Sequence, residues 1–337
     1  LSSSSAASDV YKRQDNDSQY ISNCVLDIER RYYNDNKVQY WCRVSNESRT
    51  SSPFLLSSSD FADPGSFRRT IASQGTFHFY DWSLRDLAKL SEFETTKPNI
   101  VDAKLIDGYG WDEEHRFYAF PNGIITKGQF YPANDEGLIQ VDGKYFSVKT
   151  DFVFMGNKKP LVLAELPDVS LKTFLLASSS KIIGKPTEYP GLLILGWFLS
   201  TFYHDVFFSP LGKEYRSESS FPFLKITGTQ SSGKTSLISL LMNIVGYEVT
   251  AGDSYRSSSS NFWAKSLYAN RNLPMWFDEI HPESRVNQEM VKGVYNHGGY
   301  GIGTINATSV LPMKASLVLS GQNTIDEYLN RSIYISM

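Results

Sequence analysis

Eight residues in the second half of the chain have the types and spacing of a phosphate-binding loop. Residues 228–235 read GTQSSGKT and fit the pattern G-x-x-x-x-G-K-[ST], between an apolar run and a run with helical spacing. The glycines let the backbone curl so that its N–H groups point at phosphate oxygens, and the following helix adds its positive end. The sequence therefore predicts an ATP site formed by Gly228, Thr229, Gln230, Ser231, Ser232, Gly233, Lys234 and Thr235.

Two residues of this loop and a later acidic pair supply the chemistry expected of an ATPase. Lys234 should reach the β- and γ-phosphates, and the Thr235 hydroxyl should bind Mg²⁺. The acidic pair, Asp278 and Glu279, ends an apolar run. We expect Asp278 in the Mg²⁺ shell and Glu279 beside the attacking water, and the second acid favours hydrolysis over nucleotide storage.

Two further candidates flank later apolar runs. Residues 316–323 read SLVLSGQN, and the amide of Asn323, with Gln322 as the next candidate, could contact the γ-phosphate or the lytic water. Arg331 comes just before another apolar run and could neutralise transition-state charge on a neighbouring subunit's nucleotide. The start of a loop, for the amides, and a surface or salt-bridged arginine, for Arg331, remain open alternatives.

The runs that carry these residues predict an α/β fold. Residues 221–227, 273–277 and 316–320 are nearly all hydrophobic, which is typical of parallel strands buried on both faces. We expect a P-loop NTPase domain with a mostly parallel sheet at 191–337, truncated at its C-terminus and weakly active by itself. A linker at 169–190 and a mixed α+β domain at 15–168 precede it. Residues 1–14 resemble translated sequencing adaptor or a disordered start.

The α+β domain is indicated by short β-like runs punctuated by turns. These runs are residues 38–44, 116–126, 137–148 and 160–166, and the Asp142-Gly143 step inside the third predicts a hairpin. A helix is expected over 82–94, with Ser83 as its N-cap and three leucines at helical spacing, Leu84, Leu87 and Leu90.

Composition excludes several classes of protein. The 337 residues are 41% hydrophobic, 14% aromatic and 20% charged with a net charge of −3, which indicates about two globular domains and no polybasic character. The two cysteines form no Cys-x-x-Cys, and the five histidines show no metal-ligand spacing. A reducing, cytoplasmic setting is the default expectation. The longest apolar run, 192–203, is too short to span a membrane.

The motifs GTQSSGKT, WFDE, LSGQN and DEYLNR together resemble the ATPase core of superfamily-three helicases and related AAA+ proteins. More closely, the chain is similar to a bacterial domain-of-unknown-function family in phage, plasmid and integrative-element replication proteins. The likeness extends upstream through FRRTIASQG at 67–75 and GYGWDEEHRFYAFPNGII at 108–125, and so covers most of residues 38–337.

The resemblance implies a replicative motor of the helicase or primase-helicase type. Such a protein forms a homo-oligomeric ring, commonly a hexamer, hydrolyses ATP between subunits and moves along DNA, with single strands as the expected form and often a primase as partner. On this resemblance Asn323 takes the sensor role and Arg331 the finger role. An ATP-dependent regulatory switch or scaffold without DNA translocation is the alternative, and a small-molecule kinase also remains open.

Two regions of the sequence could bind DNA. The glycine-rich run at 298–304 predicts a flexible loop or hairpin tip, on which Tyr300 could stack on a base with Lys292 near a phosphate. In the first half, basic and aromatic residues could form a stacking platform: Arg68, Arg69, Lys158, Lys159, Tyr80, Trp82, Tyr109 and Trp111. A surface loop and core aromatics are the respective alternatives.

Overall fold

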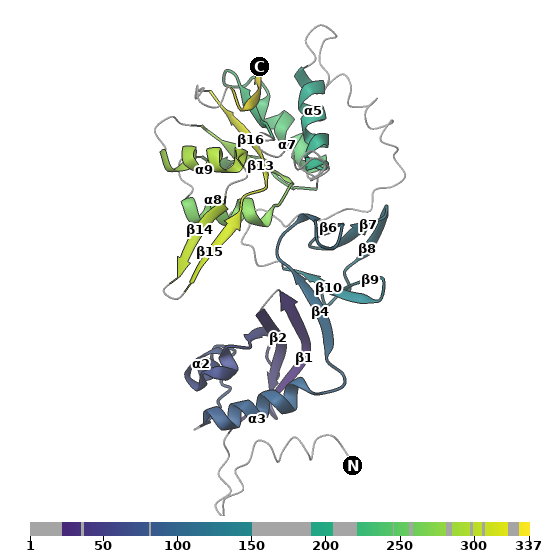
Figure 1. The fold of residues 1–337 in the computed structure, drawn as a ribbon, viewed down its shortest axis with the longest axis vertical. Coiled ribbons are helices and arrows are strands. Elements are labelled where there is room, and N and C mark those ends of the chain that lie inside the picture. The colour runs from purple at the N-terminus through teal and green to yellow at the C-terminus, as the bar shows by residue number, and fades with distance from the viewer. Residues whose placement is uncertain are drawn as a thin grey trace, which may run out of the picture. The chain divides into compact units, whose positions relative to one another are not determined.

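The computed structural model describes residues 22–34, 37–80, 82–149, 190–204, 221–244, 246–255, 259–280, 285–296, 299–304, 307–322 and 330–337. The chain divides into two compact units (Figure 1). The first unit is Leu1–Ile106 with Asn134–Ser147, and the second is Asp107–Ala133 with Val148–Met337. Residues 107–133, which lie in the stretch assigned by sequence to the N-terminal domain, therefore pack with the second unit.

The first unit is built on a six-stranded sheet of order β3-β2-β1-β4-β10-β9. The strands are β1 (Val25–Asn34), β2 (Lys37–Ser45), β3 (Phe54–Ser57), β4 (Val101–Ile106), β9 (Ile139–Val141) and β10 (Lys144–Val148). Strand β1 runs antiparallel to β2 and parallel to β4. The sheet is therefore mixed.

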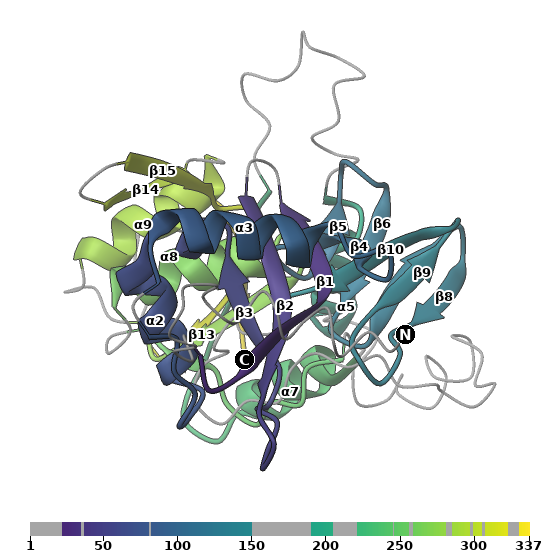
Figure 2. The ribbon, with the colours of Figure 1, turned by 90° about the horizontal axis from the view of Figure 1, so that it is seen from below.

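Short helices cover one face of this sheet: η1 (Asp60–Ala62), α2 (Pro64–Ala72) and α3 (Leu84–Thr95). Figure 2 shows α3 running across β1, β2 and β3. Leu87 and Leu90 of α3 share a core with Leu26 and Cys42 of the sheet. The Ser83 N-cap is confirmed, because its hydroxyl accepts from the Asp86 N–H and the Asp86 carboxylate accepts from the Ser83 N–H.

The second unit is built on a five-stranded parallel sheet of order β12-β13-β16-β11-β17. The strands are β11 (Phe223–Thr227), β12 (Asp253–Ser254), β13 (Pro274–Asp278), β16 (Ser316–Gly321) and β17 (Ser332–Ser336). Every residue of β11 and β16 is buried, which confirms the parallel sheet expected from the apolar runs. Strand β16 lies between β11 and β13.

Helices and a hairpin precede or connect these strands. They are α5 (Pro190–Thr201), α7 (Lys234–Ile244), α8 (Ser260–Ala269), α9 (Arg285–Tyr295) and the antiparallel pair β14 (Gly299–Thr304) and β15 (Ala307–Pro312). The glycine-rich run at 298–304, expected to be a flexible loop or hairpin tip, is instead the first strand of a hairpin from Gly299 onward. In the part of the chain that the structure describes, no helix is long and apolar enough to cross a membrane.

A small antiparallel sheet of order β5-β6-β7-β8 completes the second unit. Its strands are β5 (Gly110–Asp112), β6 (Phe117–Phe120), β7 (Gly123–Thr126) and β8 (Gln129–Pro132). The run at 116–126, expected to be one strand, is two strands because Pro121 and Asn122 form the turn between them. The predicted strand at 160–166 lies outside the described residues, as does the predicted linker except for Pro190.

Candidate nucleotide site at the edge of the parallel sheet

The carboxyl ends of β11, β16 and β13 bring the predicted phosphate loop and acidic pair to one edge of the sheet. Thr227, the last residue of β11, pairs with Gly321 of β16, and Leu319 of β16 pairs with Phe277 of β13. The loop after β11 and the acids after β13 therefore flank the end of β16. The carboxyl edge of a parallel sheet is where such folds bind ligands.

The phosphate-loop residues form a tight curl between β11 and α7. Ser231 and Gly233 have positive φ angles of 66° and 92°, and the Ser232 N–H donates to the Thr229 carbonyl at 3.3 Å. A left-handed non-glycine residue is uncommon and marks a constrained turn. Since α7 begins at Lys234, the curl opens onto a helix N-terminus, which suits an anion.

The Lys234 ammonium folds back into this curl. Its Nζ donates to the Gly228 carbonyl at 2.9 Å, to the Thr229 carbonyl at 2.6 Å and to the Ser232 hydroxyl at 3.2 Å. All three ammonium hydrogens have an acceptor within the loop. The lysine thus lies where a phosphate bound by the loop would meet its charge.

The acidic pair differs in exposure and backbone conformation. Asp278 is half-buried, and its Oδ1 accepts from the Glu279 N–H at 2.9 Å and from the Ser320 hydroxyl at 2.6 Å. Glu279 is exposed and has a φ of +58°. The carboxylate of Asp278 is therefore held by its neighbours, whereas that of Glu279 faces solvent.

The donor set at this edge fits a magnesium ion. Thr235, in the first turn of α7, offers an exposed hydroxyl, and Asp278 offers a carboxylate oxygen. Both are the hard oxygen ligands that Mg²⁺ prefers, usually alongside waters and substrate phosphates. The described residues contain no group of three or more His, Cys, Asp or Glu arranged to hold a metal ion.

The two remaining site predictions have different outcomes. Asn323 lies outside the described residues, and Gln322 is exposed at the end of β16. Arg331 comes directly before β17, where its carbonyl accepts from the Phe223 N–H and its guanidinium lies 5.6 Å from the centre of the Tyr295 ring. Phe223 begins β11 and Gly228 follows its last residue. Arg331 therefore lies at the amino ends of the strands, and the phosphate loop lies at their carboxyl ends. The fold does not bring Arg331 to Lys234 within one chain.

Two residues considered for an aromatic platform in the first half are core aromatics instead, as the alternative interpretation has it. Trp82 is 4% exposed within the core of the first unit, and Tyr109 is completely buried in the second. Neither ring face is available to a base. Tyr80 is 47% exposed, and Lys158 and Lys159 lie outside the described residues.

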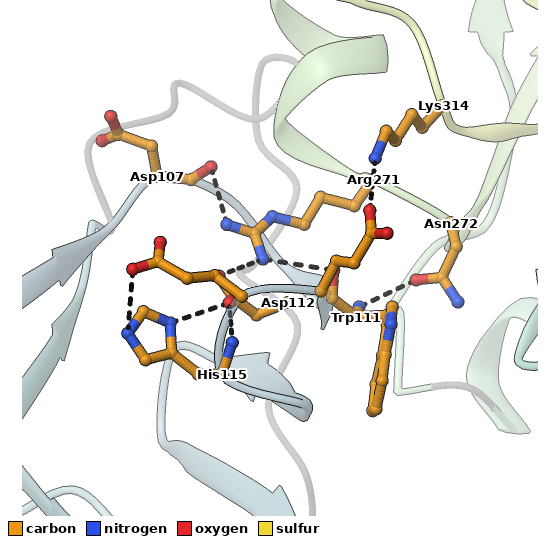
Figure 3. Close-up of polar contacts among 9 residues, drawn as sticks. Asp107, Trp111, Asp112, His115, Arg271, Asn272 and Lys314 are labelled. Atoms are coloured by element: carbon orange, nitrogen blue, oxygen red, sulfur yellow. Dashed lines mark hydrogen bonds and ion pairs between the residues drawn. The ribbon is translucent and has the colours of Figure 1, made fainter. Parts of the chain in front are cut away.

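A cross-link that the sequence analysis missed joins the small sheet to the turn between α8 and β13 (Figure 3). Arg271 Nη1 donates to Asp112 Oδ2 at 2.7 Å and to the Trp111 carbonyl at 3.2 Å. Asn272 Oδ1 accepts from the Trp111 N–H at 2.9 Å. We call Arg271 and Asn272, with these partners, the Arg271–Asn272 clamp. It explains why residues 107–133 belong to the second unit.

Neighbouring groups in this clamp change the pKa of Asp112. Burial raises the pKa of the Asp112 carboxyl, but the Arg271 charge and hydrogen bond, together with hydrogen bonds from His115, outweigh burial. The pKa of Asp112 therefore lies below its usual value, and the carboxylate stays ionised at neutral pH. The only sequence signal was the polar cluster DEEH at 112–115.

Comparisons with known proteins support the fold. No protein-family model matches the chain, and no curated protein sequence matches it either. Among solved structures, the chain resembles one titled as the active helicase SCCmec type IV Cch, with a TM-score of 0.53 and 13% identity over 97% of this chain and 57% of that one. The chain thus spans little more than half the length of that helicase. The likeness shows a helicase-like α/β fold.

A second solved structure is the apo form of the NrS-1 C-terminal region. It aligns with a TM-score of 0.38 and 10% identity, over 91% of this chain and 57% of that one. A superposition this loose adds nothing to the fold assignment.

Proposed function

We propose that this chain is an ATP-hydrolysing motor of the replicative helicase type that acts on DNA. One observation carries the proposal: the curled loop with Lys234 at the start of α7 shares a sheet edge with Asp278 and Glu279. The helicase-like fold supports it. A phage, plasmid or other mobile element is the proposed setting, on the motif resemblance alone.

In the proposed reaction, the loop N–H groups and Lys234 bind the phosphates and neutralise charge that develops on the leaving group. Thr235 and Asp278 would hold Mg²⁺, which supplies further charge neutralisation at the phosphates when bound. The exposed Glu279 carboxylate orients the attacking water and accepts its proton.

The same geometry favours assembly of several chains. Arg331 lies at the far edge of the sheet from its own phosphate loop, so it could act as a finger only on a neighbouring subunit's nucleotide. A homo-oligomeric ring is therefore part of the proposal, with Asn323 as its sensor residue and a primase as a candidate partner.

The first experiment measures ATP turnover with and without single-stranded DNA. Lys234→Ala should abolish turnover, and Lys265→Ala, at an exposed lysine of α8, is the matched control that should not. Turnover that needs Lys234 and rises severalfold with DNA would support the motor. Turnover that needs Lys234 but ignores DNA would contradict the motor and favour a regulatory switch or scaffold.

A further inference from the structure

Three side chains from two neighbouring strands form a hydrogen-bonded row beside the candidate site. The Trp276 indole Nε1 lies 2.6 Å from the Ser320 hydroxyl, and that hydroxyl lies 2.6 Å from Asp278 Oδ1. Trp276 pairs with Val318, so Trp276 and Asp278 on β13 and Ser320 on β16 share one face of the sheet. We call Trp276, Ser320 and Asp278 the Ser320 relay.

The direction of the relay follows from the chemistry of its members. An indole N–H can only donate, so the Ser320 oxygen must accept from Trp276. An ionised carboxylate can only accept, so the Ser320 proton goes to Asp278. With the tryptophan as fixed donor and the aspartate as fixed acceptor, the hydroxyl has one orientation that satisfies both.

The surroundings leave the relay little freedom. Trp276 is 2% and Ser320 1% exposed, and the Ser320 carbonyl accepts from the Ile280 N–H at 3.3 Å. A Cβ at Gly252 would lie 2.8 Å from Trp276 Nε1 and 2.9 Å from Asp278 Cβ, so the backbone there approaches more closely than any side chain allows. Buried, directional hydrogen bonds of this kind hold a carboxylate in one orientation.

The geometry points to Ser320 as the positioning residue for the Asp278 carboxylate, with its own hydroxyl oriented by Trp276. Asp278 Oδ1 is occupied by the Ser320 hydroxyl and the Glu279 N–H, so Oδ2 is the oxygen that would bind Mg²⁺. This inference rests on the proposed function, because it explains how the acid that would hold Mg²⁺ is kept in place.

The test measures the binding of a fluorescent, non-hydrolysable ATP analogue to the full chain as Mg²⁺ is titrated. Ser320→Ala should require about 10- to 100-fold more Mg²⁺ for the half-maximal gain in affinity, as is typical when a residue behind a metal ligand is lost. Affinity for the analogue without Mg²⁺ should not change. Ser320→Thr keeps the hydroxyl and should restore most of the Mg²⁺ response.

Ser316 provides the matched control at the other end of β16. It is also buried, at 2% exposed, and its hydroxyl donates to the Asn272 carbonyl at 3.1 Å. Ser316→Ala should lower the melting temperature about as much as Ser320→Ala but leave the Mg²⁺ titration unchanged. An equal Mg²⁺ shift in both variants would mean a general packing effect and overturn the inference.

Two further outcomes separate this inference from the proposed function. Suppose that the parent protein binds the analogue in a way that depends on Lys234 and on Mg²⁺, and that Ser320→Ala gives the same Mg²⁺ titration. That result would overturn the relay and leave the proposed function standing. A parent protein without Lys234-dependent binding would overturn both. If Ser320→Ala does not fold, Trp276→Phe removes the fixed donor together with part of the buried ring, and should shift the Mg²⁺ titration in the same direction by a smaller factor.

Discussion

The backbone places two adjacent carboxylates, Asp278 and Glu279, in different surroundings. Asp278 is the last residue of β13 and keeps extended pairing, so its side chain is held against β16. Glu279 turns into the left-handed region at once, and its side chain reaches solvent. A held acid suits a metal shell, and a free one suits proton transfer to or from a water.

Glu279→Gln replaces the carboxylate by an amide and tests whether Glu279 accepts a proton in the proposed reaction. The amide cannot take a proton, so turnover should fall by about 10²-fold or more while affinity for Mg²⁺–ATP stays within about twofold. Steady-state turnover and analogue binding on the same preparation check this. Glu92→Gln, at an exposed position of α3, is the control. Equal losses in binding and turnover would argue against a role for Glu279 in the chemical step.

At the scale of helices and strands, the turn between α8 and β13 connects several parts of the second unit. It carries the Arg271–Asn272 clamp at the amino end of the strand that bears Asp278 at its other end. Asn272, 1% exposed, also donates to the Thr201 carbonyl at the end of α5. One turn thus joins the small sheet, α5 and the acid-bearing strand.

Asp112→Asn should destabilise the second unit by about 2 kcal/mol at neutral pH, because Arg271 loses its charged partner. The folded pKa of Asp112 is below its unfolded value of about 3.9, so its stabilisation is full above that value and is lost as pH falls through the folded pKa. Chemical unfolding from pH 7 to pH 3 should therefore show the parent and variant converging in acid.

The control for this measurement is Asp135→Asn, which changes an exposed aspartate of the first unit. It should follow the parent protein at every pH. A stability difference between Asp112→Asn and the parent that stays constant down to pH 3 would show that the carboxylate charge does not stabilise the clamp.

Hairpins and helices could be predicted where the residues that define them are neighbours in the sequence. The Asp142-Gly143 hairpin is confirmed, with Val141 paired to Lys144 and both turn residues at positive φ. The helical spacing of the leucines was right for Leu87 and Leu90, but Leu84 begins α3 and is 57% exposed. A first-turn residue has no preceding turn of helix to help cover it.

The candidate site was predictable only in part, because some of its contacts join segments that are far apart in the sequence. The strand–loop–helix context of GTQSSGKT is local and could be read from the sequence. The place of β16 between β11 and β13 depends on long crossovers, so the contact of Ser320 with Asp278 had no local signal. The pairing of Arg271 with Asp112 spans 159 residues, and Arg271 alone looks like any surface arginine in a turn.

For the molecule as a whole, the two units are interleaved in sequence. The chain passes from one to the other at 106–107, at 133–134 and at 147–148. The second unit thus takes its small sheet from residues that precede part of the first unit's sheet. A fragment that begins at α5 would lack β5–β8 and would leave the Arg271–Asn272 clamp without its partners.

Core substitutions should show whether each unit unfolds as its own cooperative body. Leu26→Ala, at 0% exposed in the first unit, and Leu317→Ala, at 1% in the second, should each cost about 2–5 kcal/mol. Calorimetry should show each variant lowering a different transition, and analogue binding should be lost with the transition that Leu317→Ala lowers. A single transition moved equally by both variants would show one cooperative body instead.

The bonds of Lys234 within its own loop would make the proposed binding of ATP an exchange of hydrogen-bond partners. The ammonium must give up carbonyl and hydroxyl acceptors at Gly228, Thr229 and Ser232 before it can serve a phosphate. Part of the attraction for the anion offsets the loss of these bonds, which lowers the affinity for a phosphate. Lys234→Ala therefore removes both the charge that meets the nucleotide and the internal tie that shapes the loop before the nucleotide arrives.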